Sequence, residues 1–303
     1  MPHPLIISNA HSGRGHAGRV VGRAVEELRR SGIAPALLPV DRGNPAAFRG
    51  RFDRALRDAS AVILAGGDGT VHYALPVVAG SGVPVYHLPL GTENLFSREF
   101  GSCTDPARLV RALRGGRARA VDLGGASPQA GGPPTLFALM CSVGPDAGVI
   151  RRLHAARTGA ISHLSYVRPM VEELTRPSLP VLSVEVDGRA LVHRERGMVV
   201  VANSRHYGAR FNPAADAVVD DGLLDVVFFP AGSGPAAMLW LLRSLLGVHT
   251  SHPACVTARA RSVLVTGDGP LPHQLDGELG RHETTVLDLA VRPAALRVLV
   301  APD

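Results

Sequence analysis

Short apolar runs alternate with amphipathic stretches through the first ninety residues of the chain. The apolar runs at residues 5–8, 36–40, 61–65 and 83–88 predict strands, while residues 18–31 and 71–78 predict helices. Strands separated by helices form βαβ units, in which the strands are parallel and the helices cover the sheet. The N-terminal part is therefore expected to be a Rossmann-like parallel α/β domain, and 303 residues leave room for a second domain.

The second half of the chain has a different pattern, in which strand signals dominate. Strands are expected at residues 181–186, 198–202, 224–229, 262–266, 285–291 and 296–300, and helices at 148–153, 165–174 and 235–246. Glycine, proline, serine and glutamine gather at residues 124–134, which indicates a domain boundary. The fold class is thus α/β followed by β, with the division near residue 126.

Composition removes several classes of function. All 32 basic residues are arginine, so chemistry that depends on lysine, such as a Schiff base or a Walker A loop, is excluded. The three cysteines lie far apart in the chain, which argues against a zinc knuckle or a disulfide framework. The net charge of +6 suits an anionic partner. Because only 4% of residues are aromatic and no basic run carries stacking residues, nucleic acid is not expected.

No stretch of the sequence predicts a targeting signal or a membrane span. The longest apolar stretch, residues 236–248, is interrupted by Arg243 and is shorter than the roughly 20 residues that cross a bilayer. We expect a cytoplasmic protein. Apolar residues are too frequent within residues 236–246 for a simple surface helix, and Trp240, the single tryptophan, suits either a core helix or a membrane interface.

Two glycine-containing loops carry the clearest chemical signal. The sequence Gly66-Gly67-Asp68-Gly69-Thr70 follows a predicted strand directly and opens a helix, so its backbone N–H groups can approach phosphate oxygens without side-chain obstruction. Asp68 is placed to hold a metal ion or to orient a phosphoryl group. The second loop, residues 88–96, follows the next strand. Loops at the carboxyl ends of neighbouring parallel strands converge where open α/β sheets bind ligands, which predicts a phosphate site.

Two acidic turns occur in the second half. Taken from the residues alone, Asp220-Asp221-Gly222 is typical of a hairpin turn. The second turn, Asp276-Gly277-Glu278, has two carboxylates close together, which suits general-base work on an alcohol.

The order of the motifs resembles that of the diacylglycerol kinase catalytic-domain family, which includes bacterial lipid kinases and sphingosine kinases. Any one of these motifs is weak alone, and GGDGT is shared with NAD kinases, but together they span nearly the whole chain. They are residues 8–13 (SNAHSG), 66–70 (GGDGT), 89–101 (PLGTENLFSREFG), 142–147 (SVGPDA), 201–204 (VANS), 220–226 (DDGLLDV) and 274–278 (QLDGE).

The resemblance implies a fold and an activity. The β-rich domain, residues 127–291, would be a β-sandwich that binds the lipid acceptor and magnesium, and the last strand would return to the N-terminal domain, adding residues 292–303 to residues 1–126. The active site would lie in the cleft between the domains. The activity would be ATP- and Mg²⁺-dependent transfer of the γ-phosphoryl group to a hydroxyl of a diacylglycerol-like or sphingoid-like lipid, at the inner face of the membrane.

The resemblance also assigns residues to roles. Glu278 would accept the proton, with Asp276 and Asp68 as further catalytic residues, and either Glu278 or Asp276 could be the base. Asp221 would hold Mg²⁺ together with the main-chain oxygens of Val218 and Leu223. The phosphates of ATP would be lined by Asn9, Ser12, Gly13, Gly66, Gly67, Asp68, Gly69, Thr70, Thr92 and Asn94.

Some residues depart from the family pattern, and some alternatives stay open. Ala10 replaces a usual proline, His72 and Tyr73 replace Asn-Glu, and Leu95 replaces an acidic residue, which leaves the lipid open. Residues 13–18 form a G-x-G-x-x-G with Asp41 downstream, typical of NAD-dependent oxidoreductases, but two further phosphate loops and an acidic hairpin argue against that class. An NAD kinase, a regulator that binds nucleotide or lipid without turnover, and a homodimer remain open.

Overall fold

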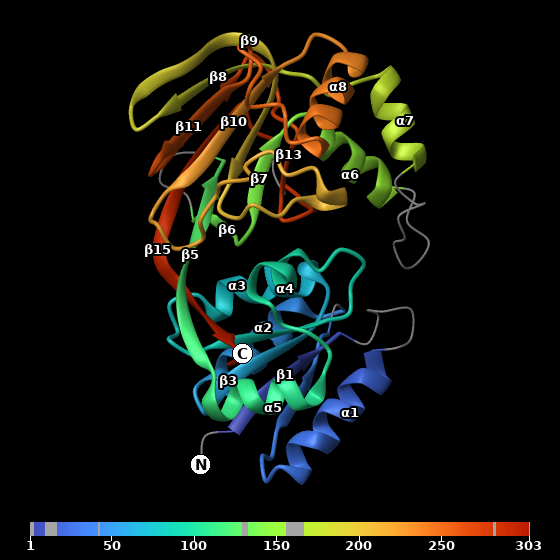
Figure 1. Cartoon of the computed structure of the whole chain (residues 1–303), viewed down its shortest axis with the longest axis vertical. Coiled ribbons are helices and arrows are strands. Elements are labelled where there is room, and N and C mark those ends of the chain that lie inside the picture. The colour runs from blue at the N-terminus through green and yellow to red at the C-terminus, as the bar shows by residue number, and fades with distance from the viewer. Residues whose placement is uncertain are drawn as a thin grey trace. The chain divides into compact units, whose positions relative to one another are not determined.

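The computed structural model describes residues 3–9, 17–41, 43–128, 133–155, 167–280 and 283–302 (Figure 1). The chain divides into two compact units, Met1–Val121 with Ala294–Asp303, and Asp122–Pro293. It passes from one unit to the other within strand β5 (Arg117–Ser127) and again within strand β15 (Val286–Val300). Each passage is therefore made by continuous strand rather than by a linker.

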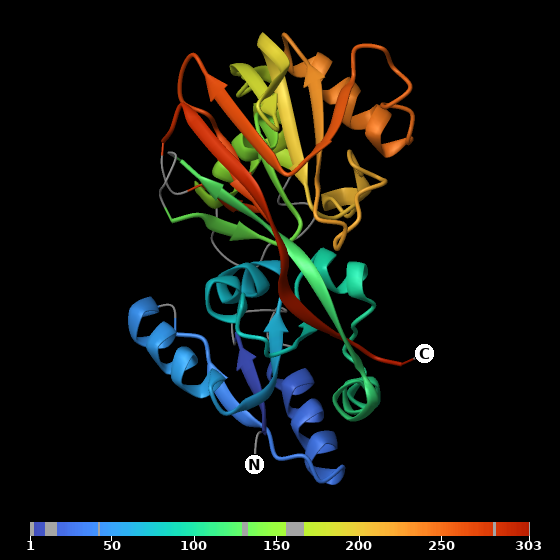
Figure 2. The same ribbon diagram turned by 90° about the vertical axis from the view of Figure 1, so that its left-hand side faces the viewer.

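The first unit is built on a parallel sheet in the order β2-β1-β3-β4, with the end of β15 beside β4. Its strands are β1 (His3–Ser8), β2 (Ala36–Pro39), β3 (Ala59–Gly66) and β4 (Val85–Pro89). The four strands predicted in this region are confirmed. Val298 of β15 pairs with Val85 in parallel register, so the final strand does return to the N-terminal sheet (Figure 2).

Helices cover both faces of this sheet. The helices are α1 (Ala17–Arg30), α2 (Pro45–Leu56), α3 (Asp68–Val78), α4 (Leu95–Phe100) and α5 (Pro106–Gly115). Leu28 of α1 and Leu109 of α5 share one buried cluster with Ile63 of β3, while Phe48 of α2 packs on Tyr73 of α3. Because both faces of β3 are covered, its sequence is almost continuously apolar and buried.

The second unit is a β-sandwich, and its described residues form three α-helices. One sheet contains β5, β6 (Thr135–Phe137), β8 (Val181–Val186), β12 (Ser262–Gly267) and β15. The other sheet contains β7 (Met140–Val143), β10 (Leu224–Pro230), β11 (Val256–Ala260), β13 (His273–Leu275) and β14 (Glu278–Leu279). Strand β9 (Arg189–Ala202) pairs with β8 along its first half and with β7 and β10 along its second half. The core between the sheets holds Phe137, Val199, Phe228 and Leu287.

The three helices of this unit are α6 (Pro145–Ala155), α7 (Val167–Thr175) and α8 (Gly234–Leu245), and they pack in sequence against one another (Figure 1). All three were predicted from the sequence. None of the helices in the described part of the chain has both the length and the hydrophobicity needed to cross a bilayer.

Two expectations about strands need correction. Residues 285–291 and 296–300, predicted as separate strands, form the single strand β15, in which Ala294 takes a left-handed backbone conformation with φ of 51°. Gly124 lies inside β5 rather than in a linker. It must be glycine because a Cβ there would lie 1.9 Å from the Phe137 ring. The contacts within the chain divide the units at residues 121 and 294, each within five residues of the predicted boundaries at 126 and 292.

Candidate active site

The two glycine loops of the first unit touch each other through their backbones. A Cβ on Gly67 would lie 3.0 Å from the Gly91 Cα, and a Cβ on Gly91 would lie 2.7 Å from the Gly67 Cα. The Leu90 N–H also donates a 2.7 Å hydrogen bond to the Gly66 carbonyl oxygen. The loops therefore form one rigid backbone surface, and glycine is required at the contact because any side chain would separate them.

Asp68 links the first loop to the helix that follows the second. Its two carboxylate oxygens accept 3.0 Å hydrogen bonds, one from the Leu95 N–H and one from the Phe96 N–H. These amides begin α4 and have no partner within their own helix. The carboxylate thus caps α4 from a different loop, which gives Asp68 a structural role beside the catalytic role expected from the sequence.

Asn94 shapes the second loop from within. It takes a left-handed backbone conformation with φ of 50°, and its side chain accepts from the Gly91 N–H at 2.7 Å and donates to the Gly91 carbonyl oxygen at 2.9 Å. Both ends of the amide are used by the loop itself. Thr92, on the same loop, is exposed.

The first loop opens helix α3, whose N-terminus carries no side-chain cap. Gly67 is the N-cap residue, and Asp68 and Gly69, both partly exposed, form the first turn. Uncapped amides at a helix N-terminus favour an anion such as phosphate. Asn9 and Thr70 are buried next to this loop and share a 3.4 Å hydrogen bond, so the structure brings Gly66, Thr70 and Asn9 together. Ser12 and Gly13 lie outside the described residues.

His87 is a residue near these loops that the sequence reasoning missed. It is completely buried on β4, and its Nε2 atom lies 2.9 Å from the Gly66 carbonyl oxygen, with the Phe96 ring beside it. Since a carbonyl oxygen only accepts, Nε2 carries the proton; Nδ1 has no hydrogen-bond partner in the part of the chain that the structure describes. Burial lowers the pKa of His87 below its ordinary value, although the Asp68 charge opposes this shift. A single histidine within the apolar run at residues 83–88 was the available signal.

In the second unit, the acidic turn joins β13 to β14 as a tight hairpin. Asp276 and Gly277 both have positive φ, 51° and 85°, and Leu275 pairs with Glu278 across the turn. Glu278 is partly exposed, and within the described residues its carboxylate has no hydrogen-bond partner. The hairpin predicted from the sequence is thus present, and Glu278 follows directly after its tip.

The carboxylate of Asp276 points to a different task. It accepts hydrogen bonds from three consecutive backbone N–H groups, those of Ala138 at 2.8 Å, Leu139 at 2.8 Å and Met140 at 3.0 Å. A carboxylate that already accepts three backbone hydrogen bonds is poorly placed to accept a proton from a substrate. Asp276 therefore holds the hairpin against residues 138–140.

Gln274 connects this hairpin to a polar cluster. Its side-chain oxygen accepts from the Gly277 N–H at 2.7 Å, and its amide nitrogen donates to Ser142 Oγ at 2.7 Å and to Asp146 Oδ2 at 3.3 Å. Tyr207 donates its hydroxyl hydrogen to the same Asp146 oxygen at 2.6 Å. The sequence marked residues 142–147 and Gln274 only as family motifs, and the structure shows that they form one network.

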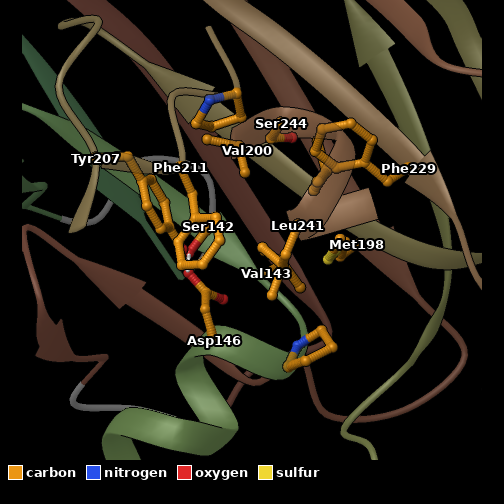
Figure 3. Close-up of a pocket in the computed structure, with 13 residues that line it drawn as sticks. Ser142, Val143, Asp146, Met198, Val200, Tyr207, Phe211, Phe229, Leu241 and Ser244 are labelled. Carbon is orange, nitrogen blue, oxygen red and sulfur yellow. Dashed lines mark hydrogen bonds between the residues drawn. The ribbon is translucent and has the colours of Figure 1, made fainter. Parts of the chain in front are cut away.

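This polar cluster forms one corner of a small pocket with mainly apolar walls (Figure 3). Tyr207, Ser142 and Asp146 gather on one side, and the pocket volume is about 30 Å³. The apolar lining comes from several elements and includes Val143, Val200, Phe211, Phe229 and Leu241. By volume the pocket holds roughly one or two water molecules, so only a small group fits in it.

The predicted metal ligands lie at a second acidic turn of this unit. Asp221 accepts a 3.0 Å hydrogen bond from the Leu223 N–H through one oxygen and pairs with Arg259 through the other. Burial, together with the Asp216 charge, raises the pKa of the nearby Asp225 to about 6. The described residues include no group of three or more His, Cys, Asp or Glu side chains that could hold a metal ion.

The oxygen donors at this turn nevertheless fit a hard cation. Carboxylate and main-chain carbonyl oxygens are the ligands that Mg²⁺ prefers. The pKa of Asp225 is raised mainly by burial and further by the Asp216 charge, so a nearby cation would favour the charged form of Asp225. Arg259, which pairs with Asp221, supplies part of the positive charge at this turn.

Comparison with known proteins decides the family. Residues 3–126 match the diacylglycerol kinase catalytic domain, and residues 140–300 match the YegS C-terminal NAD kinase beta sandwich-like domain. The chain belongs to the diacylglycerol kinase family. It is a lipid kinase, as expected from its motifs, and the NAD kinase alternative is not favoured. Family membership also implies ATP as the phosphoryl donor, a lipid as acceptor and a divalent metal ion.

Relatives of this diacylglycerol kinase family member cover most of its length. It is 27% identical to "Diacylglycerol kinase" of Mycobacterium tuberculosis strain CDC 1551 over 295 residues, which is 97% of this chain and 93% of the relative. It is 29% identical to "Probable lipid kinase YegS-like" of Pseudomonas fluorescens, over 80% of this chain and 78% of the relative. A crystal structure of a diacylglycerol kinase from Bacillus anthracis shares the fold, with a TM-score of 0.70 at 16% identity over 99% of this chain and 97% of that one.

Proposed function

We propose that this lipid kinase transfers the γ-phosphoryl group of Mg²⁺-bound ATP to the free hydroxyl of a diacylglycerol-like lipid at the inner surface of a membrane. The observation that carries the proposal is the phosphate site formed by the Gly67–Gly91 contact and the uncapped start of α3. The relative named "Diacylglycerol kinase" supports the choice of lipid. A sphingoid base is the second candidate, because His72 and Leu95 depart from the pattern of bacterial diacylglycerol kinases.

The first unit would bind the nucleotide. The amides at the start of α3 would receive phosphate oxygens, with Thr70 and Asn9 buried behind the loop and Thr92 on the neighbouring loop. Phosphoryl transfer requires little covalent work from the protein, so a rigid arrangement of donors accounts for most of this unit's contribution. Asp68 and Asn94 would act by keeping the two loops in place.

Glu278 would be the proton acceptor. The lipid hydroxyl oxygen attacks the γ-phosphorus, the bond between that phosphorus and the β,γ-bridging oxygen breaks, and ADP leaves. The hydroxyl proton passes to the Glu278 carboxylate as the new bond forms. Such general-base assistance typically contributes ~10²–10⁴-fold. Of the two candidates for the base, the Glu278 carboxylate accepts no hydrogen bond from the described residues, whereas three N–H groups hold that of Asp276.

Asp276 and Gln274 would be positioning residues for Glu278. Asp276 fixes one side of the hairpin against residues 138–140, and Gln274 fixes the Gly277 amide. Through Gln274 the hairpin is coupled to the Asp146 corner of the pocket.

A divalent ion would be held by the Asp221 carboxylate with the main-chain oxygens of Val218 and Leu223. Bound there, Mg²⁺ would neutralise the carboxylates around Asp225 and order the turn. Arg259 would have to release the Asp221 oxygen that it now contacts.

The proposal is tested with γ-³²P-labelled ATP and a panel of acceptors. The panel contains diacylglycerol, monoacylglycerol, a sphingoid base, ceramide, phosphatidylglycerol and NAD. Label in the diacylglycerol fraction supports the proposal, and label in the sphingoid base alone selects the second candidate. Label in NAD alone, or no label in any acceptor with magnesium present, contradicts it.

A further inference from the structure

A cluster of exposed apolar side chains covers the outer side of α8 and the turn after it. This α8 patch consists of Leu239, Leu242, Leu245, Leu246 and Val248, with Leu246 the most exposed at 74% and the others near 48%. Among the described residues, eight large apolar side chains are exposed, and five of them are in this patch. A sixth, Val171, lies on α7, which packs beside α8. Contiguous apolar surface of this kind marks an interaction site.

The opposite side of α8 is firmly attached to the second unit. Trp240 is buried, donates a 2.7 Å hydrogen bond from Nε1 to the Pro230 carbonyl oxygen, and stacks on Phe229 with ring centroids 5.2 Å apart. Leu241 and Ser244 line the pocket (Figure 3). A surface helix in contact with water normally has polar residues opposite its buried face. On α8 both faces are apolar. Packing against the second unit accounts for the apolar residues of the inner face but not for those of the outer face.

The charges around the patch favour an anionic surface. The 42 residues from Val226 to Gly267 contain no aspartate or glutamate. The Arg243 guanidinium lies over the Trp240 ring, with Cζ 5.0 Å from the ring centroid, and the side chain stays partly exposed beside the patch. On α7, Arg168 is highly exposed, and Glu172 is paired with it. Leucines beside an arginine, on a helix without acidic residues of its own, are typical of helices that lie in a lipid interface.

We propose that the α8 patch docks onto the surface of a bilayer containing anionic lipid, with its leucines inserted among the lipid chains. This proposal rests on the proposed function, because a kinase whose acceptor is a membrane lipid must work at the bilayer surface. A bilayer fits better than a second copy of the chain, because α8 also forms a wall of the pocket whose polar corner is coupled to the Glu278 hairpin. Docking would place that wall next to the lipid.

The test uses the full chain and vesicles of phosphatidylcholine with or without phosphatidylglycerol. The variant is Leu239→Glu with Leu242→Glu, and the control is Leu37→Glu, since Leu37 is exposed to the same 47% but lies on β2 of the other unit. We expect salt-sensitive co-sedimentation of the wild type with phosphatidylglycerol vesicles, an unchanged control, and at least about tenfold weaker binding of the variant. Equal binding by all three proteins would overturn the proposal.

Trp240 provides a second readout that locates the contact. It is the only tryptophan, so quenching of the chain's tryptophan fluorescence by brominated lipids reports the approach of α8 alone to the bilayer. Quenching of the wild type that is lost in the variant supports docking through α8. Vesicle binding without quenching places the contact elsewhere. Concentration-dependent dimerisation that the variant abolishes, without vesicle binding by the wild type, assigns the patch to a second copy. Either of these two results contradicts the proposal.

Activity on two forms of the substrate separates this inference from the proposed function. With a dispersed short-chain diacylglycerol the variant should match the wild type, whereas with diacylglycerol in vesicles it should lose at least about tenfold in rate. Equal vesicle activity in both proteins overturns the docking proposal alone. Absence of phosphorylation by the wild type with either form overturns the proposed function, whatever the vesicle binding shows.

Discussion

Gly67 and Gly91 lie so close that a side chain on either would collide with the α-carbon of the other. Gly91→Ala should separate the two loops, because its Cβ would stand 2.7 Å from backbone that cannot rotate away. We expect a loss of about 1–3 kcal/mol in unfolding free energy and weaker ATP binding. Urea unfolding and nucleotide titration measure the two effects.

Gly22→Ala is the matched control for this substitution. Gly22 lies within α1 with nothing within 4 Å of the added Cβ, so alanine should be neutral or slightly stabilising there. An equal response of the two variants would mean that the loops are not in contact. From the sequence alone, a side chain at Gly67 would be expected to block the approach of a phosphate group. In the structure, that side chain would first collide with the backbone of Gly91.

Asp68→Ala should affect stability as well as turnover. Removal of the carboxylate leaves the Leu95 and Phe96 amides without their cap, a loss of typically ~1 kcal/mol or somewhat more. Asp68→Asn keeps one acceptor oxygen and should fall between Asp68→Ala and the wild type. Thermal unfolding of both variants, with Asp58→Ala on the exposed turn after α2 as control, checks this order. If Asp68→Ala were as stable as the wild type, Asp68 would have only the catalytic role expected from the sequence.

Asp276→Asn should lower stability and turnover together. Asparagine offers a single acceptor oxygen to the three N–H groups of residues 138–140, and its amide group would face one of them as a second donor. Leaving such a donor unsatisfied costs roughly 1–3 kcal/mol. The measurements are urea unfolding, kcat and the Kd for ATP, the last of which should not change. If Asp276→Asn lost activity while keeping full stability, Asp276 would be the base instead of Glu278.

His87 should make stability depend on pH. Because burial lowers its pKa in the folded state, the unfolded chain binds a proton below the ordinary value of 6.5 while the folded chain resists it. The stabilising contribution is therefore present above about pH 6.5 and is lost as the pH falls below that value, by at most about 1.4 kcal/mol per pH unit. His87→Gln should flatten the difference in unfolding free energy between pH 7.5 and pH 5.5. The exposed His193→Gln should leave it unchanged.

Much of the first unit could be predicted because its strands are short, buried and separated by helices. Two of its helices, α2 and α4, were missed, although α2 has a clear start: Asn44 caps the first turn, which begins at Pro45. Their apolar positions are few, so periodicity alone did not reveal them. In the second unit, β7 and β13 are only three or four residues long, which gives little pattern to detect.

The site could be predicted as a set of residues but not as a set of contacts. The motifs identified the two loops and the Asp276 hairpin, because glycines and acidic turns are visible in sequence. The bonds from Asp276 to residues 138–140 join positions more than 130 residues apart, and the bonds from Asp68 to α4 join two separate loops. No local pattern encodes such pairings. They give both aspartates a structural role beside the catalytic roles that the sequence predicts.

The rate of label transfer from γ-³²P-ATP to diacylglycerol by the wild type and by Glu278→Gln is the most direct test of the proposed chemistry. Glutamine keeps the size of the side chain and removes its basicity. The account predicts that the wild type labels the lipid, and that the variant is slower by ~10²–10⁴-fold in single turnover with the Kd for ATP and the stability unchanged. Equal rates for the two proteins, or label that appears in NAD and never in lipid, would contradict it.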